Sequence, residues 1–234
     1  KFENNDNKNF KIKSIKEKLN IEPLKTETIN FLNWFSEYNL VPLGMTLKLH
    51  LLSGNGVEKK TKSEYENYQS KFSKEEFKLS DEQENAFKNI IKNDSFFRVH
   101  LLQGTTGSGK TIVYFKAIEK IIAKGLQTLI LLPEIGLTGE FEKKFKIFFG
   151  FEAAIWHSKI APKKKKLIWS GLSNGNIKVI IGARSALFLP FQNLGLIVVD
   201  EEHDQSFKQD EGVTYNARDM AIARASSENI PINL

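Results

Sequence analysis

The 234-residue chain contains no cysteine, so disulfides and any cysteine-ligated zinc site are excluded within this stretch. No apolar run approaches the length of a membrane span, and the first residues contain no signal-peptide core. The apolar fraction of 41% is ordinary for a globular protein of this size. These features favour a cytoplasmic protein with one sizeable core, or one core plus a small appendage.

Arginine is also scarce, because only four of the 34 basic residues are arginine. The net charge of +6 favours a polyanionic partner. That charge carries little weight alone, since AT-rich coding also produces a Lys-, Asn- and Ile-rich chain. Because arginine is rare in this chain, each one is more informative about function. Its planar guanidinium binds anions in a bidentate geometry that a lysine ammonium cannot match.

Composition and periodicity divide the chain into three predicted segments. In residues 1–52, helical spacing of apolar residues predicts a helix over 24–38. After a Pro- and Gly-containing break, alternation of apolar and polar residues predicts a half-exposed strand over 45–51, which makes this a small α+β segment. Residues 53–78 are polar and are predicted to be a linker.

From residue 79 onward, short apolar runs alternate with helical segments. Ser80 is the expected N-cap of a helix that extends to about Lys92. Strands this apolar, separated by helices, imply a parallel sheet with both faces covered. The prediction is a doubly wound α/β domain whose strands are residues 99–103, 128–132, 153–156, 179–181 and 196–199.

A phosphate-binding loop is predicted at Gly104–Thr111, which matches G-x-x-x-x-G-K-[ST] between a strand and a helix. Its backbone N–H groups would face phosphate oxygens at the positive end of the helix. Lys110 would reach the β- and γ-phosphates of ATP, and the Thr111 hydroxyl would bind Mg²⁺. A chance Gly/Ser/Thr turn is disfavoured by this setting. The expected ATP-binding residues of the loop are Gly104, Thr106, Gly107, Ser108, Gly109, Lys110 and Thr111.

An acidic pair, Asp200 and Glu201, follows the apolar run 196–199. Asp200 at the end of that strand can hold Mg²⁺, and Glu201 can orient and deprotonate the water that attacks the γ-phosphate. Taken alone, such a cluster is usually a solvated loop. Because the carboxyl ends of parallel strands open on one edge, this pair can instead converge with Lys110. Asp followed by Glu fits a hydrolase better than a kinase.

Several segments resemble the superfamily 2 helicases, and most closely the primosomal replication-restart helicases. Residues 79–83 resemble the Q motif, in which Gln83 would contact adenine, and residues 131–138 resemble motif Ia. The runs 182–188 and 200–219 are more typical of the replication-restart family than of other helicases. The resemblance implies a RecA-like lobe of a 3′→5′ DNA helicase that uses ATP and Mg²⁺. It also implies forked or single-stranded DNA, primosome proteins and single-strand-binding protein as partners.

The same resemblance suggests DNA contacts beyond the nucleotide site. Charged and hydroxyl side chains would meet DNA phosphates, and aromatic rings would stack on unpaired bases. His203 would link the nucleotide site to neighbouring motifs. The alternatives are that Phe207 packs in the core, that Arg218 pairs with Asp219 or Glu211, and that His203 is a satisfied structural histidine. The candidate DNA contacts are Arg184, Ser185, Phe207, Lys208, Tyr215 and Arg218.

Residues 31–44 resemble, more faintly, the junction between the 3′-DNA-binding domain and the winged helix of that family. The chain ends where motif III is expected, so the second RecA-like lobe with its arginine finger lies outside it. A cysteine-rich zinc-binding insertion is expected only outside this chain. The chain alone is therefore expected to hydrolyse ATP poorly. Two alternatives remain: another superfamily 2 translocase, RecG-like or restriction-type, and a DNA-binding primosome scaffold with a dispensable ATPase.

Overall fold

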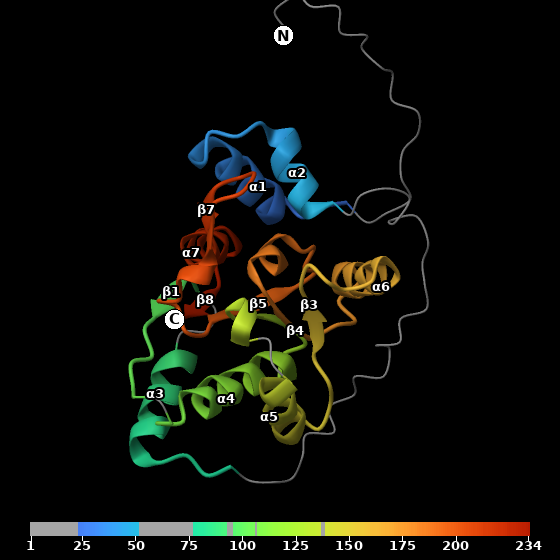
Figure 1. Cartoon of the computed structure of the whole chain (residues 1–234). Helices are drawn as coiled ribbons and strands as arrows, with labels where there is room; N and C mark the ends of the chain where they lie inside the picture. Colours follow the sequence, from blue (N-terminus) through green and yellow to red (C-terminus); the bar gives the residue numbers. More distant parts are fainter. Residues whose placement is uncertain (1–22, 52–76, 93–95, 106, 137–138) are drawn as a thin grey trace, which may run out of the picture.

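A six-stranded parallel sheet forms the centre of the computed structural model, which describes residues 23–51, 77–92, 96–105, 107–136 and 139–234 (Figure 1). Its strand order is β1-β8-β5-β2-β4-β3, and every neighbouring pair is parallel. The doubly wound α/β prediction is confirmed. The strands are β1 (Arg98–His100), β2 (Gln127–Leu131), β3 (Ala154–Trp156), β4 (Val179–Gly182), β5 (Leu194–Val199) and β8 (Pro231–Asn233).

Helices cover both faces of this sheet (Figure 1). Side chains alternate along a strand, so Leu129 and Leu131 of β2 enter one core while Ile130 and Leu132 enter the other. The described helices contain no segment long and apolar enough to cross a membrane. One core holds residues of α3 (Asp81–Ile91), α4 (Lys110–Ala123) and α5 (Gly139–Phe149), and the other those of α1 (Thr26–Tyr38), α6 (Pro162–Ser173) and α7 (Ala217–Glu228).

The start of α3 is set by its sequence, as predicted. Ser80 is the N-cap, and the Gln83 backbone N–H donates to its hydroxyl across 3.3 Å. The Gln83 side chain accepts from the Ser80 backbone N–H across 3.0 Å, which completes a reciprocal capping box. The predicted linker before this helix falls mostly outside the described residues.

The prediction of a strand over residues 45–51 is wrong. All of these residues except Leu51 belong to α2 (Leu43–His50), and the regular elements of the described N-terminal segment are both helices. The side chains that α2 buries are Thr46 and His50, which helical spacing brings to one face. The alternating pattern predicted that these two polar residues face solvent and that Met45 faces the core. Met45 is instead 41% exposed.

Strand β8 was not predicted, because its run of three residues is short and begins with proline. It inserts between β1 and β5, with Ile232 beside both Val99 and Ile197. Strand β1 therefore lies at the sheet edge, and Val99 stays 42% exposed. The first predicted strand is correspondingly shorter and less buried than its apolar sequence suggested.

A buried polar cluster joins the N-terminal helices to the short helix η2 (Arg184–Phe188). The three consecutive carbonyl groups of residues 187–189 are all bonded by distant side chains. Arg224 donates to the first and the third, and His50 Nδ1 lies 2.7 Å from the second. Burial lowers the pKa of His50 to about 4, so its ring is neutral at pH 7 and Nδ1–H can be the donor. These contacts fix the chain just beyond β4.

Candidate nucleotide-binding site

The predicted phosphate loop connects β1 to α4. Gly107 and Gly109 adopt φ values of 83° and 81°, which only glycine adopts without strain, and Gly109 is the N-cap of α4. Lys110 is the first residue of that helix, and its Nζ donates to the Gly104 carbonyl oxygen across 2.6 Å. Thr106 lies outside the described residues. The loop thus presents the start of a 14-residue helix and one cation where phosphates are expected.

Gln83 lies beside this loop. Its Nε2 donates to the Ser108 carbonyl oxygen across 2.9 Å, while its Oε1 completes the cap of α3. The side chain therefore bridges the capping box and the phosphate loop. Its contact with adenine stays a prediction.

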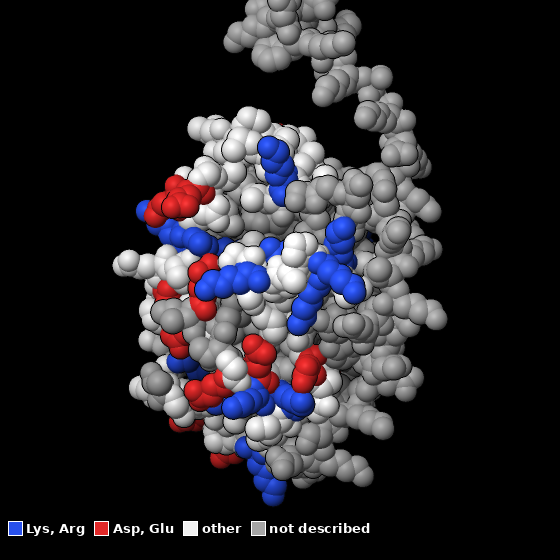
Figure 2. All heavy atoms as spheres, turned by 45° about the vertical axis from the view of Figure 1, so that its right-hand side comes forward, with Lys and Arg blue, Asp and Glu red and all other residues white. Residues whose placement is uncertain are grey.

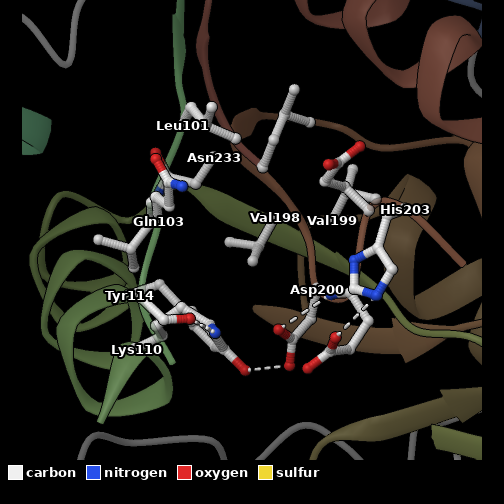
Figure 3. Close-up of a pocket in the computed structure, with 14 residues that line it drawn as sticks. Leu101, Gln103, Lys110, Tyr114, Val198, Val199, Asp200, His203 and Asn233 are labelled. Atoms are coloured by element: carbon white, nitrogen blue, oxygen red, sulfur yellow. Dashed lines mark hydrogen bonds and ion pairs between the residues drawn. The ribbon is translucent and has the colours of Figure 1, made fainter. Parts of the chain in front are cut away.

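The acidic pair begins where β5 ends. The Asp200 backbone N–H donates to the Leu131 carbonyl oxygen across 3.0 Å, which extends the sheet by one bond. Glu201 has a φ of 51°, a left-handed conformation that is rare for a residue other than glycine. Its backbone N–H donates to Asp200 Oδ1 across 3.1 Å. This bend lets both carboxylates line a pocket together with Lys110 (Figure 3). The residues predicted to serve one nucleotide site thus converge.

Thr111, the other expected Mg²⁺ ligand, lines a second hollow with the same acidic pair on the α5 side of the loop. Burial raises the pKa of Asp200 above its usual range, against the hydrogen bond from Tyr114 and the charge of Lys110. A cation beside this carboxylate would favour its ionised form. The hydroxyl of Thr111 and the carboxylate of Asp200 are oxygen donors of the type that Mg²⁺ prefers.

Tyr114 is a site residue that the sequence reasoning missed. Its hydroxyl donates to Asp200 Oδ2 across 2.9 Å, and the ring is buried in the wall of the pocket (Figure 3). The signal that could have found it is helical spacing, because a residue three positions after Thr111 lies on the same face of α4.

Arg184 and Ser185 lie at the carboxyl end of β4, as expected. Arg184 is partly exposed; it donates to the Lys208 carbonyl oxygen and lies 3.9 Å from the Glu134 carboxylate. The exposed Ser185 hydroxyl accepts from Trp156 Nε1 across 3.2 Å. Gly182 is required before this turn, because a Cβ there would lie 2.9 Å from the Trp156 carbonyl oxygen. Basic side chains form a broken band across the face shown in Figure 2, and several acidic side chains lie below it.

The prediction that Phe207 and Tyr215 offer stacking faces to DNA bases needs correction. Phe207 is 1% exposed and Tyr215 is 4% exposed. The ring of Tyr215 packs edge-on against Phe35 and Phe188, with centroids 5.4 and 5.5 Å away. Both rings belong to the core, and Phe35 of the N-terminal helix α1 is one of the residues that cover Tyr215. The core alternative weighed for Phe207 is therefore the one the structure supports.

The other candidates around the acidic pair are on the surface. Lys208 is exposed and pairs with Asp210 at 3.1 Å. His203 is exposed, and its Nε2 lies 3.6 Å from Glu201 Oε2, so it is not a buried structural histidine. Arg218 contacts Asp219 at 2.9 Å, which is one of the pairings considered as the alternative to DNA contact, and it also contacts Glu202 at 3.1 Å.

Comparison with known proteins agrees with this arrangement. Residues 80–230 match the model of the DEAD/DEAH box helicase family. The chain belongs to this family, whose members use ATP and Mg²⁺. The RecA-like α/β fold is consistent with that membership.

Within that family, the curated relatives include replication restart protein PriA from several bacteria. The chain is 43% identical over 225 residues to PriA of Rickettsia felis, covering 96% of this chain and 34% of that protein. It is 42% identical over 171 residues to PriA of Bacillus subtilis, covering 71% and 21%. It thus spans about a third or less of the length of these relatives. Among solved structures, the UvsW helicase from bacteriophage T4 aligns with a TM-score of 0.49 and 14% identity, over 73% of this chain and 57% of that one.

Proposed function

We propose that this chain provides the ATP-binding lobe of a DNA helicase that acts in replication restart. The observation that carries the proposal is the convergence of Lys110, Asp200 and Glu201 on one pocket at the edge of the sheet. The similarity to replication restart protein PriA supports the restart role, the 3′→5′ polarity and forked or single-stranded DNA as substrate. Primosome proteins and single-strand-binding protein are the proposed partners, and the bacterial nucleoid is the proposed location.

The proposed chemistry is ATP hydrolysis, with the described residues dividing the work. The Lys110 ammonium neutralises charge on the β- and γ-phosphates, and the loop N–H groups hold phosphate oxygens. Thr111 and Asp200 hold Mg²⁺, which supplies further charge neutralisation when bound. Glu201 orients the attacking water and accepts its proton. Its left-handed backbone turns the carboxylate towards the same pocket as Lys110.

The proposed DNA contact with the strongest geometric support is Arg184. It lies at the carboxyl edge of the sheet, where its partly exposed guanidinium is next to the exposed hydroxyl of Ser185. Lys208 lies beside Arg184, because its backbone carbonyl oxygen accepts a hydrogen bond from that guanidinium. Its side chain therefore extends the basic surface. A guanidinium in this position can donate hydrogen bonds to phosphate oxygens in place of its 3.9 Å contact with Glu134.

The test of this function is ATP turnover of the full-length protein that contains this chain, measured with and without single-stranded DNA, because the chain spans only about a third of the length of its PriA relatives. We expect DNA to stimulate turnover and Arg184→Ala to need more DNA for the same stimulation. Its DNA binding should weaken uniformly across sequences, and its salt slope should fall by about 1. Lys120→Ala, which removes a positive charge from α4, is the control and should respond to DNA like the unaltered chain. Turnover that is indifferent to DNA would rule out a DNA-driven motor.

A further inference from the structure

Tyr114 connects the helix of the phosphate loop to the acidic pair. The residue lies in the second turn of α4, and only 3% of it is exposed. Its hydroxyl points across the pocket to Asp200 Oδ2 at 2.9 Å (Figure 3).

Asp200 is therefore held at both of its oxygens. Oδ2 accepts from Tyr114, and Oδ1 accepts from the Glu201 backbone N–H at 3.1 Å. Each carboxylate oxygen has two lone pairs, so each keeps one for a further ligand. Two donors at opposite oxygens fix the rotation of the carboxylate plane. Nothing else among the hydrogen bonds of the described side chains holds Oδ2, so this orientation depends on Tyr114.

We propose that Tyr114 is a positioning residue that orients Asp200 for the Mg²⁺ of bound ATP. The inference rests on the proposed function, because it requires that Asp200 ligates the cation. A donor behind a ligating carboxylate both orients it and lowers the cost of keeping it charged in a partly buried site. Tyr114 itself need not touch nucleotide or metal.

The variant that tests this role is Tyr114→Phe, which removes one oxygen and keeps the ring packed edge-on against Phe115. The readout is the Mg²⁺ concentration that half-saturates binding of a fluorescent ATP analogue. Loss of an outer hydrogen bond to a metal ligand typically costs about 10–100-fold in metal affinity. We expect a rise of about tenfold or more in that concentration, with analogue binding in EDTA unchanged. Tyr38→Phe, the same change on an exposed ring of α1, should alter neither quantity.

A second comparison keeps the test independent of folding. Asp200→Asn removes the charge that Tyr114 is proposed to orient, so adding Tyr114→Phe to it should change the Mg²⁺ requirement no further. Mn²⁺ binding followed by electron paramagnetic resonance should show the same order of variants. An unchanged Mg²⁺ requirement in Tyr114→Phe, or an equal effect of that change with Asn at position 200, overturns the inference alone. Failure of the unaltered chain to bind the analogue in Mg²⁺ overturns the proposed function as well.

Discussion

The Glu201→Gln variant is expected to bind ATP as tightly as the unaltered chain and to hydrolyse it about 100-fold to 10,000-fold more slowly. Glutamine keeps the size of the side chain but cannot accept a proton from the attacking water. Phosphate binding should survive, because it depends on the loop and Lys110, which this change leaves intact. The measurement is phosphate release by the full-length protein that contains this chain, under saturating ATP and single-stranded DNA, with analogue affinity determined on the same samples.

The neighbouring carboxylate provides the control for that experiment. Glu202 also lines the pocket, but its carboxylate is paired with Arg218 at 3.1 Å. Glu202→Gln removes the same charge one residue later, so it should keep turnover within a few-fold of the unaltered chain. A loss as large as that of Glu201→Gln would show that local charge, and not a base at position 201, determines the rate. Unchanged turnover in Glu201→Gln would exclude it as the base.

The Arg224→Met variant is expected to lose about 3–5 kcal/mol of unfolding free energy, because removing one member of a buried ionic cluster leaves its partners unpaired. Arg224 is fully buried and donates to the carbonyl oxygens of Leu187, within η2, and of Leu189, just after it. Its guanidinium also lies over the rings of Phe31 and Phe191, at 5.6 and 5.0 Å. The Glu228 carboxylate, 3.5 Å away, would be stranded in the core.

Urea unfolding measures this loss, and the same helix supplies the control. Arg218 also lies on α7, but its two ion pairs are solvated at the surface. Arg218→Met should therefore cost about 1 kcal/mol or less. If the unfolding free energies of the two variants differ by less than about 1 kcal/mol, the buried cluster does not join the N-terminal helices to the lobe. A selective loss in Arg224→Met would support that joining role.

Local patterns were sufficient to predict the sheet and the phosphate loop. The strands are apolar on both faces and are separated by helices, which is typical of few folds other than a covered parallel sheet. The spacing of glycines, lysine and threonine around Lys110 follows from the chemistry of phosphate binding. It can therefore be recognised from the local sequence without any distant contact. Asp200 could be placed beside Lys110 because both follow strands that end at the same edge.

Tertiary contacts decided the features that could not be predicted. Helix α2 buries Thr46 and His50, and the carbonyl oxygen that His50 contacts lies 138 residues away, so its sequence looked like a half-exposed strand. Tyr215 is aromatic and near the site, which suggested base stacking until the packing of Phe35 against it was seen. Helical spacing could have placed Tyr114 on the face of α4 that carries Thr111, but not its hydrogen bond to Asp200, which lies 86 residues away.

The central claim is that the loop ending in Lys110 binds the phosphates of ATP beside the acidic pair. The most direct measurement is a titration of the chain with a fluorescent ATP analogue in Mg²⁺, repeated for Lys110→Ala and for Lys120→Ala. Truncating one member of a hydrogen-bonded charge pair costs about 2–5 kcal/mol, so Lys110→Ala should weaken binding by a factor of about 30 to several thousand. Lys120→Ala should bind like the unaltered chain. Equal affinity in the Lys110→Ala and unaltered chains would contradict the claim.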